Sequence, residues 1–355
     1  ASNNVQEAAL EAYLDRMTRL LLDKELLDSK PTDVVHVIAR AQTLTLARKL
    51  DGIRKGNLVR YLHELGLLER EPLLDLAGAD LSGMDLTFAI LGATNLSGVD
   101  LSKANLWMSD LRESTLARSN LSRADARGAN LNDADLSSAN LSGATLHATS
   151  LNQVKLSDAD LSGATLTHAD LGNSDLSHAN LSRAFLKGAK LGHADLRRAR
   201  FTEATLTEAD LRDAVLLEAS LSDAELVGAN LAQVVLSRAD LRGANLSRAN
   251  LSAAKLEGTT FEEAILSGAK LTAANAEMAD FRNRVLHKAT LSEAVLSEAD
   301  LSEADLTAAE LQQADRSLVN LTGANLRLAD LTRAYLTRAN LHMANIAAAT
   351  LTMTD

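Results

Sequence analysis

Every fifth residue between Leu76 and Leu351 is bulky and apolar, at 53 of 56 positions and with no slip in register. From Ala79 onward, the residue two positions before each of these is small, with Met84 and Arg284 as the exceptions. Between Ala79 and Ala349 this second position is Ala in 42 of 55 cases. A period of five fits neither an α-helix, which repeats every 3.6 residues, nor a flat strand, which repeats every two. The backbone must therefore turn by the same angle every five residues, which predicts a solenoid.

The polar residues of the repeat also argue against a helix. Ser, Thr, Asp, Asn and Gly are frequent at the other three positions, and they compete with helical hydrogen bonding. We expect the bulky and the small residue to point into the solenoid and the other three to face water. Asp and Asn recur directly before the bulky residue, where they are expected to hydrogen-bond to the backbone of a turn.

The repeat reads A-(D/N)-L-x-x, as in Ala79-Asp80-Leu81-Ser82-Gly83 and Ala139-Asn140-Leu141-Ser142-Gly143. It resembles the consensus of the pentapeptide repeat proteins over residues 76–355. The resemblance implies an all-β solenoid, a right-handed parallel β-helix of quadrilateral cross-section. Four pentapeptides make one coil and each forms one face, so the chain would have about 14 coils.

Residues 1–75 follow a different pattern, which predicts about three helices. Apolar residues at helical spacing predict a first helix over Val5–Leu27. The second is expected to start after Thr32 or Asp33, since either residue can cap a helix. The third covers about Arg54–Leu65 and is followed by a glycine that can end it.

We expect residues 1–75 to form a small helical cap, because the end of a solenoid exposes apolar side chains and unpaired backbone. The predicted domains are thus 1–75 and 76–355. Parts of the first are similar to the segment before the repeats in a bacterial, often membrane-anchored subgroup of the family. Those parts are Leu21-Leu22-Asp23-Lys24, Ala39-Arg40-Ala41-Gln42-Thr43-Leu44 and Leu50-Asp51-Gly52-Ile53-Arg54-Lys55-Gly56. The similarity implies a cytoplasmic solenoid, tethered to a membrane if the full-length protein follows that subgroup.

The repeats carry 25 basic and 35 acidic residues, a net charge of −10. This balance argues against direct binding of nucleic acids, which needs clustered Lys and Arg. It favours attraction to a basic partner. The chain has no Cys, which excludes disulfides and thiolate metal sites. It also has no apolar run long enough to span a membrane.

No pattern of residues indicates catalysis, a metal or a cofactor. The eight His are scattered, and the acidic residues recur at an outward position of the repeat. Paired carboxylates that act as acid and base need a cleft that excludes water, which an uninterrupted solenoid lacks. The sequence therefore predicts a protein that is not an enzyme.

Four residues break the inward pattern. Arg284 stands at a small position and Arg316 at a bulky one, where a buried, unpaired guanidinium would be costly. Either each coil distorts so that the side chain reaches water, or these residues mark a kink or a partner site. Ala126 and Ala276 replace bulky residues, so they should leave thin spots in the core or be filled by shifts of their neighbours.

One of the four predicted faces is near neutral and begins with apolar residues that we place on the outside. They are Met84, Phe88, Trp107 and Met108, with Phe185 further along. Two interpretations stay open: these residues pack against the N-terminal helices, or they form an exposed contact patch for a partner.

Two functions compete. The best-known functional members of the family resemble duplex DNA and bind type II topoisomerases such as gyrase, which implies a DNA-mimicking inhibitor or protector of gyrase. Duplex DNA, however, carries one charge per ~1.7 Å, whereas this solenoid mixes Lys and Arg with its acidic residues on every face. The loops that interrupt the repeats in gyrase-protecting members are also absent. We therefore favour a non-catalytic rigid scaffold, rod-shaped and acidic, for protein–protein interaction.

The repeat continues through Ile346 and Leu351 with no helix after it. An uncovered last coil offers a backbone edge that can pair with another chain. We therefore expect either an end-to-end homodimer through this coil or an artificially shortened chain.

Overall fold

The computed structural model describes residues 3–23, 26, 30, 33–69, 72–315 and 318–354. The chain forms two compact units, Ala1–Leu166 and Thr167–Asp355. The first unit contains the helices and the first turns of the solenoid. The described part of the second unit consists entirely of solenoid coils. The division into a helical domain, 1–75, and a repeat domain, 76–355, stays a prediction.

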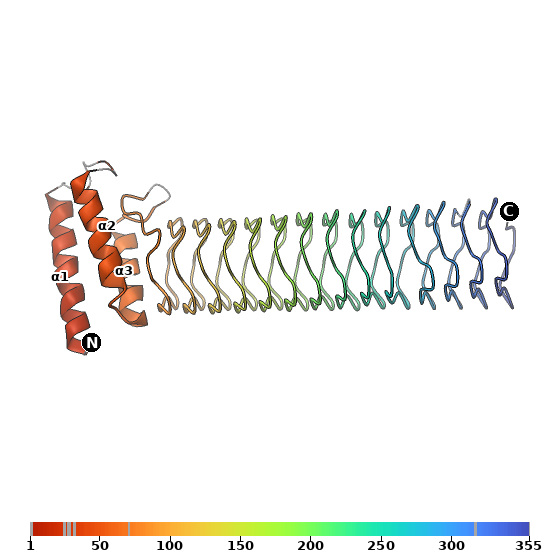
Figure 1. Ribbon diagram of the computed structural model, residues 1–355, viewed down its shortest axis with the longest axis horizontal. Helices are drawn as coiled ribbons and strands as arrows, with labels where there is room; N and C mark the ends of the chain where they lie inside the picture. Colours follow the sequence, from red (N-terminus) through yellow and green to blue (C-terminus); the bar gives the residue numbers. More distant parts are fainter. Residues whose placement is uncertain are drawn as a thin grey trace. The chain divides into compact units, whose positions relative to one another are not determined.

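Three helices precede the coils: α1 (Asn3–Leu22), α2 (Val34–Ala47) and α3 (Gly52–Glu64) (Figure 1). Their number confirms the prediction, although α1 ends before the expected Leu27. The Tyr13 hydroxyl joins α1 to α2 through Thr43 at 2.6 Å.

The starts of α2 and α3 differ. Asp33 precedes α2 but makes no capping bond with its side chain, and Thr32 lies outside the described residues. Asp51 caps α3, because its carboxylate accepts the N–H of Arg54 at 3.0 Å. Gly66 follows α3 with a φ of +70°, as expected of a glycine that ends a helix.

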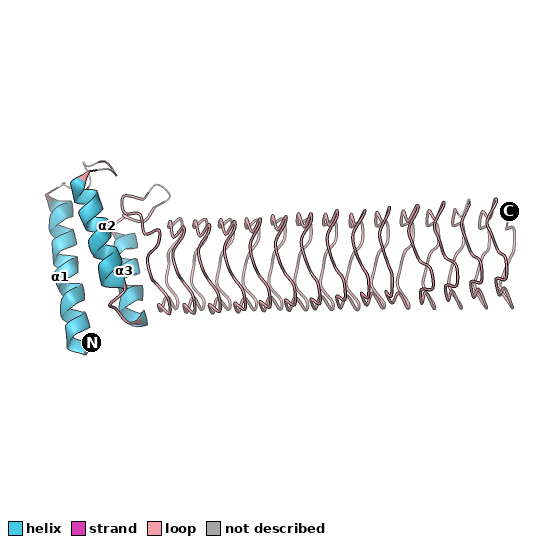
Figure 2. Ribbon diagram, viewed as in Figure 1, coloured by secondary structure: helices cyan, strands magenta, loops and turns pink. Residues whose placement is uncertain are grey.

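The repeats wind into a right-handed parallel β-helix in which each residue before a bulky one pairs with the residue 20 positions later. In the first unit these pairs run from Asp80–Asp100 to Thr145–Thr165, and in the second from Asp170–Lys190 to Asp330–Thr350. A shift of 20 means four repeats a coil, as predicted. Each face pairs through one residue only, so the coils are drawn as loops in Figure 2.

A tight turn, closed by a backbone hydrogen bond in most of the described repeats, ends each repeat. The N–H of the small residue donates to the carbonyl of the bulky residue three positions earlier, as from Ala104 to Leu101 at 3.0 Å. All 56 residues at the third position of these turns, from Gly78 to Met353, have φ between +52° and +80°. A positive φ at this position defines a type II turn. Most of these residues are not glycine, so the rest of the coil must compensate for an unfavourable conformation.

The compensation is visible in one repeat, Asp100–Ala104, in which every N–H has a partner. The first, second and fourth N–H groups donate to neighbouring coils at 2.7 to 2.9 Å, and the fifth closes the turn. The third, that of Ser102, donates to the carboxylate of Asp100 at 3.0 Å. This bond explains why Asp or Asn precedes the bulky residue so often, since a carboxylate or amide oxygen at that position can accept an N–H that the ladder does not use.

The interior consists of the bulky and the small residues, as predicted. Leu, Phe and Ala at these positions are almost all buried throughout the described coils before residue 335. Polar residues at small positions satisfy their own hydroxyls. Thr149 donates to the Ala126 carbonyl in the preceding coil at 2.8 Å, and Ser114 to the Leu111 carbonyl at 2.6 Å.

Three basic residues of the helices complete the exposed edge of the first coil. Within the solenoid, the carbonyl after a bulky residue generally accepts an N–H from the coil before it, as the Ser102 carbonyl does from Gly83 at 2.8 Å. The first coil has no such neighbour. Instead, Arg40 donates to the Ala77 carbonyl at 2.6 Å, and Lys55 to the Ser82 carbonyl at 3.0 Å. The guanidinium of Arg60 donates to the next carbonyl of the series, at 3.2 Å. The helices thus supply the donors that a preceding coil would have supplied.

Candidate interaction surface

Pairs of Asp and Arg on either side of one bulky position form forks on the surface. In each fork, Nε and Nη2 of the Arg donate to the carboxylate of the Asp two residues earlier, and the Nη2–Oδ2 distances are 2.5 to 2.7 Å. The forks are Asp110–Arg112, Asp125–Arg127, Asp195–Arg197, Asp210–Arg212, Asp240–Arg242 and Asp280–Arg282. Sequence analysis did not identify them, although each one is an Asp followed two residues later by an Arg, with a bulky residue or, in one case, Ala126 between them.

Each fork cancels the charge of its carboxylate. The hydrogen bond from the Arg side chain is the main reason why the pKa of all six Asp carboxyls lies below the ordinary value. The Asp therefore stays ionised and the Arg stays beside it. To a partner the fork presents a neutral, planar pair rather than a negative charge.

Replacing Arg197 with Ala should raise the pKa of Asp195 toward the usual value of about 3.9. In the wild type the pKa of Asp195 is lower in the folded than in the unfolded chain. The fork therefore stabilises the fold above the unfolded-state pKa, and this contribution is lost as pH falls through the folded-state pKa. Carbon-detected NMR titration of the Asp195 carboxyl measures the shift. Arg200→Ala, which leaves the fork intact, should not move it, and an unchanged pKa in Arg197→Ala would contradict the assignment.

One coil of the second unit is strongly basic. Residues 181–200 contain six Lys or Arg and a single acidic residue, whereas residues 201–220 contain five acidic residues and one Arg. Ion pairs join the two coils, as between Arg183 and Glu203 at 2.9 Å and between Arg198 and Glu218 at 2.8 Å. The acidic surface predicted from the net charge is therefore interrupted.

The apolar residues expected on the near-neutral face separate into an inward and an outward group. Met84 is fully buried, so its predicted outward position is wrong. It occupies a small position of the first coil, close to α3, where a longer side chain fills space. Phe88, Trp107 and Met108 are 42 to 60% exposed, and the Phe88 and Trp107 rings lie 4.9 Å apart. Phe185, in the second unit, is 52% exposed. Whether these four contact a partner stays a prediction.

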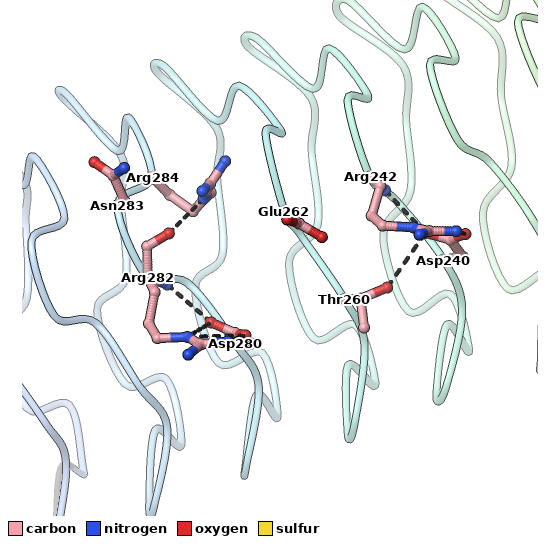
Figure 3. Close-up of a pocket in the computed structure, with 8 residues that line it drawn as sticks. All are labelled: Asp240, Arg242, Thr260, Glu262, Asp280, Arg282, Asn283 and Arg284. Atoms are coloured by element: carbon pink, nitrogen blue, oxygen red, sulfur yellow. Dashed lines mark hydrogen bonds and ion pairs between the residues drawn. The ribbon is translucent and has the colours of Figure 1, made fainter.

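Arg284 lines a groove of about 660 Å³ on the surface of the second unit (Figure 3). The side chain leaves the interior and is only half-buried, and its Nε donates to the Arg282 carbonyl at 2.6 Å. The forks of Arg242 and Arg282 flank the groove, and Glu262 lies between them (Figure 3). The guanidinium of Arg284 is thus neither fully buried nor without a hydrogen-bond partner, and its role as a partner site stays a prediction.

The other three breaks in the pattern either leave the coils undisturbed or lie outside the described residues. Ala126 and Ala276 are buried, and their N–H groups donate to the next coil at 2.8 Å, so the coils continue through both positions. Arg316 lies outside the described residues. Among described residues, no three His, Asp or Glu side chains converge closely enough to hold a metal ion. None of the described helices is long and apolar enough to cross a membrane.

The sequence matches the model of one protein family. The family described as "Pentapeptide repeats (8 copies)" matches nine overlapping or adjoining segments. They are residues 79–118, 119–158, 155–192, 179–216, 194–231, 216–252, 249–283, 285–315 and 317–352. A search of curated proteins found no match.

Several solved structures are similar to parts of the chain. HetL, a pentapeptide repeat protein involved in heterocyst differentiation regulation in the cyanobacterium Nostoc sp. strain PCC 7120, is 27% identical. The match covers 76% of this chain and 87% of HetL, with a TM-score of 0.31. QnrB1, a plasmid-mediated fluoroquinolone resistance protein, is 20% identical over 63% of this chain and 89% of its own, with a TM-score of 0.30. Rfr23 from the cyanobacterium Cyanothece 51142 is 29% identical over 38% and 87%, with a TM-score of 0.18.

Proposed function

The chain belongs to the pentapeptide repeat family, and on that premise we propose that it is a non-catalytic scaffold whose side-chain-covered faces bind a protein partner. The observation that carries the proposal is the closed hydrogen bonding of the repeat. In Asp100–Ala104 all five N–H groups are satisfied within the molecule. The faces of such a repeat offer a partner side chains on a firm backbone rather than a cleft in which chemistry is shielded from water.

Charge favours this proposal over mimicry of DNA. A mimic needs a nearly continuous negative surface, since duplex DNA carries one charge per ~1.7 Å. Here six carboxylates are cancelled by their own Arg, and residues 181–200 form a basic coil. A topoisomerase that recognises DNA would meet alternating charges.

Two measurements test the scaffold against the mimic. Affinity capture with the immobilised protein, followed by binding of each purified candidate in solution, should identify a saturable partner that is not a topoisomerase. A supercoiling assay with gyrase should show neither inhibition nor protection at micromolar concentrations of the protein. Inhibition or protection that requires the intact solenoid would replace the scaffold with the mimic. Absence of any saturable protein partner would contradict both.

Two further proposals concern the oligomeric state of the protein and its location in the cell. The last coil leaves Leu341, Ile346 and Leu351 between 38 and 46% exposed, although they stand at bulky positions. An end-to-end homodimer through this coil stays a prediction, and light scattering over a range of concentrations measures it. A cytoplasmic location likewise stays a proposal, which fractionation of cells that produce the protein would test.

A further inference from the structure

The hydrogen-bonded ladder between coils opens at one place in the second unit. Among described residues of that unit, five expected backbone bonds fall outside normal hydrogen-bond geometry, and all five join residues 258–264 to residues 277–285. We call these two stretches the open seam. The weakened bonds are Gly258 N–H to Glu277, Phe261 N–H to Asp280, Glu263 N–H to Arg282, Asp280 N–H to Thr259 and Val285 N–H to Ala264. The bridges Thr260–Asp280 and Ile265–Val285 persist, so the two coils stay paired through weakened bonds.

The ladder is intact on both sides of the open seam. One coil earlier, Gly243 N–H donates to the Glu262 carbonyl at 2.7 Å, and one coil later, Asn283 N–H donates to the Ser302 carbonyl at 2.8 Å. Thr260 and Asp280 still face each other across the seam, so the two coils keep their register. The opening is therefore a local separation of backbone groups, not a break in the solenoid.

Arg284 explains one of the weakened bonds directly. Its Nε donates to the Arg282 carbonyl at 2.6 Å (Figure 3), and this is the carbonyl that the N–H of Glu263 would otherwise meet. Ala stands at the equivalent position one coil earlier and one coil later, where the ladder is closed. We infer that Arg284 holds the seam open.

Of the three Arg side chains that line the groove, Arg284 is the one that has no carboxylate bound to it. Arg242 and Arg282 are each bound in a fork, and the charge of Glu262 acts on both of them. Among described residues, Arg284 forms no ion pair, although its charge helps to lower the pKa of Asp280. Its terminal nitrogens therefore remain as donors at the groove, and a carboxylate is the group that suits them best.

An exposed aliphatic pair adjoins Arg284. Val285 follows it in the chain, and Ile265 is the bridge partner of Val285 in the preceding coil. They are 44% and 42% exposed. The same column carries Asn245 before the pair and Asp305 after it, so two aliphatic residues replace the polar type that the repeat favours. Sequence analysis missed this pair, which interrupts the Asp/Asn column directly beside Arg284.

We propose that the open seam is the docking site for an extended acidic segment of a partner protein. A carboxylate of that segment binds Arg284, and apolar residues beside this carboxylate in the segment cover Ile265 and Val285. A groove of about 660 Å³ is large enough for a few residues in extended form. This inference rests on the proposed scaffold function and gives that function a site.

Amide hydrogen exchange tests whether the seam is open. In the wild type, the amides of Gly258, Phe261 and Glu263 should exchange much faster than those of Arg238, Leu241 and Gly243, their equivalents one coil earlier. Arg284→Ala restores the residue that neighbouring coils use, so it should fold, slow the exchange of Glu263 and raise the melting temperature. Equal exchange at the two sets of amides in the wild type would overturn the open seam.

Peptide binding tests the ligand. The probe is a fluorescein-labelled extended peptide with one Glu between Ile and Leu residues, followed by fluorescence anisotropy, with the same peptide carrying Gln as its counterpart. Wild-type protein should prefer the Glu peptide, and Arg284→Ala should bind it at least about tenfold more weakly.

Matched variants separate the site from general effects. Val285→Asn should weaken binding of the Glu peptide, whereas Val235→Asn, the same change at the same repeat position on another face, should not. Equal affinity for Glu and Gln peptides, or unchanged binding by Arg284→Ala, would overturn the docking site. If Arg284→Ala still binds a captured partner as the wild type does, the scaffold stands and the docking site falls.

Discussion

Leu221→Asp is expected to lower the free energy of unfolding of the second unit by more than about 5 kcal/mol. The Leu221 side chain is completely buried at a bulky position, among the bulky residues of the neighbouring coils. The change removes apolar burial, leaves a cavity and places a carboxylate where nothing can pair with it. Chemical denaturation followed by circular dichroism measures the loss.

The effect should also be local. In a repeat protein each coil depends mainly on its immediate neighbours, so the melted region should start around residue 221 and spread outward. Hydrogen exchange would locate it. Gln233→Asp is the control, because position 233 is exposed and has a φ of +60°, which Asp tolerates well. A loss under about 1 kcal/mol for Leu221→Asp would mean that the interior is not packed as described.

Replacing both Gly52 and Gly56 with Ala is expected to detach α3 from the first coil. A Cβ on Gly52 would overlap the Gly83 carbonyl, and a Cβ on Gly56 would overlap the Asp85 carbonyl. Neither obstacle is a flexible side chain, so helix and coil must move apart. Overpacking costs about 1–3 kcal/mol at each site, and separation would also remove Lys55 and Arg60 from the carbonyls that they complete.

Limited proteolysis and hydrogen exchange would show the detachment as faster cleavage between α2 and α3 and faster exchange at residues 76–90. Ile53→Ala is the matched control, because Ile53 lies on the same helix but is 65% exposed. Normal protection of residues 76–90 in the double Gly variant would show that α3 does not rest on the coil backbone.

The five-residue period predicted most of the solenoid because it is a local property. Each inward residue repeats the environment of the one five positions before it, so residues such as Leu221 could be placed from the sequence. The role of Asp and Asn could also be predicted, since the bond from Ser102 to Asp100 spans only two residues. Arg284 could be recognised as an exception for the same reason.

What the exception does could not be predicted. Whether Arg284 is buried or turned out depends on where its guanidinium finds an acceptor, and the acceptor is a backbone carbonyl that an N–H of the preceding coil would otherwise meet, which the repeat pattern does not reveal. Met84 is a different case. It stands at a small position, which the repeat pattern places inside, so its outward placement went against the pattern. A helix takes the place of a preceding coil beside it, and a side chain longer than Ala fits there.

The pairing of each residue with the one 20 positions later sets the step by which this solenoid could change in length. Inserting or deleting one complete coil within the second unit would leave every later side chain on the face where it began. Removing a single five-residue repeat would instead rotate all later residues by a quarter turn, so that a surface composed from several coils would be scattered over two sides. Binding surfaces of this kind are therefore expected to tolerate changes in whole coils and to be destroyed by changes in single repeats.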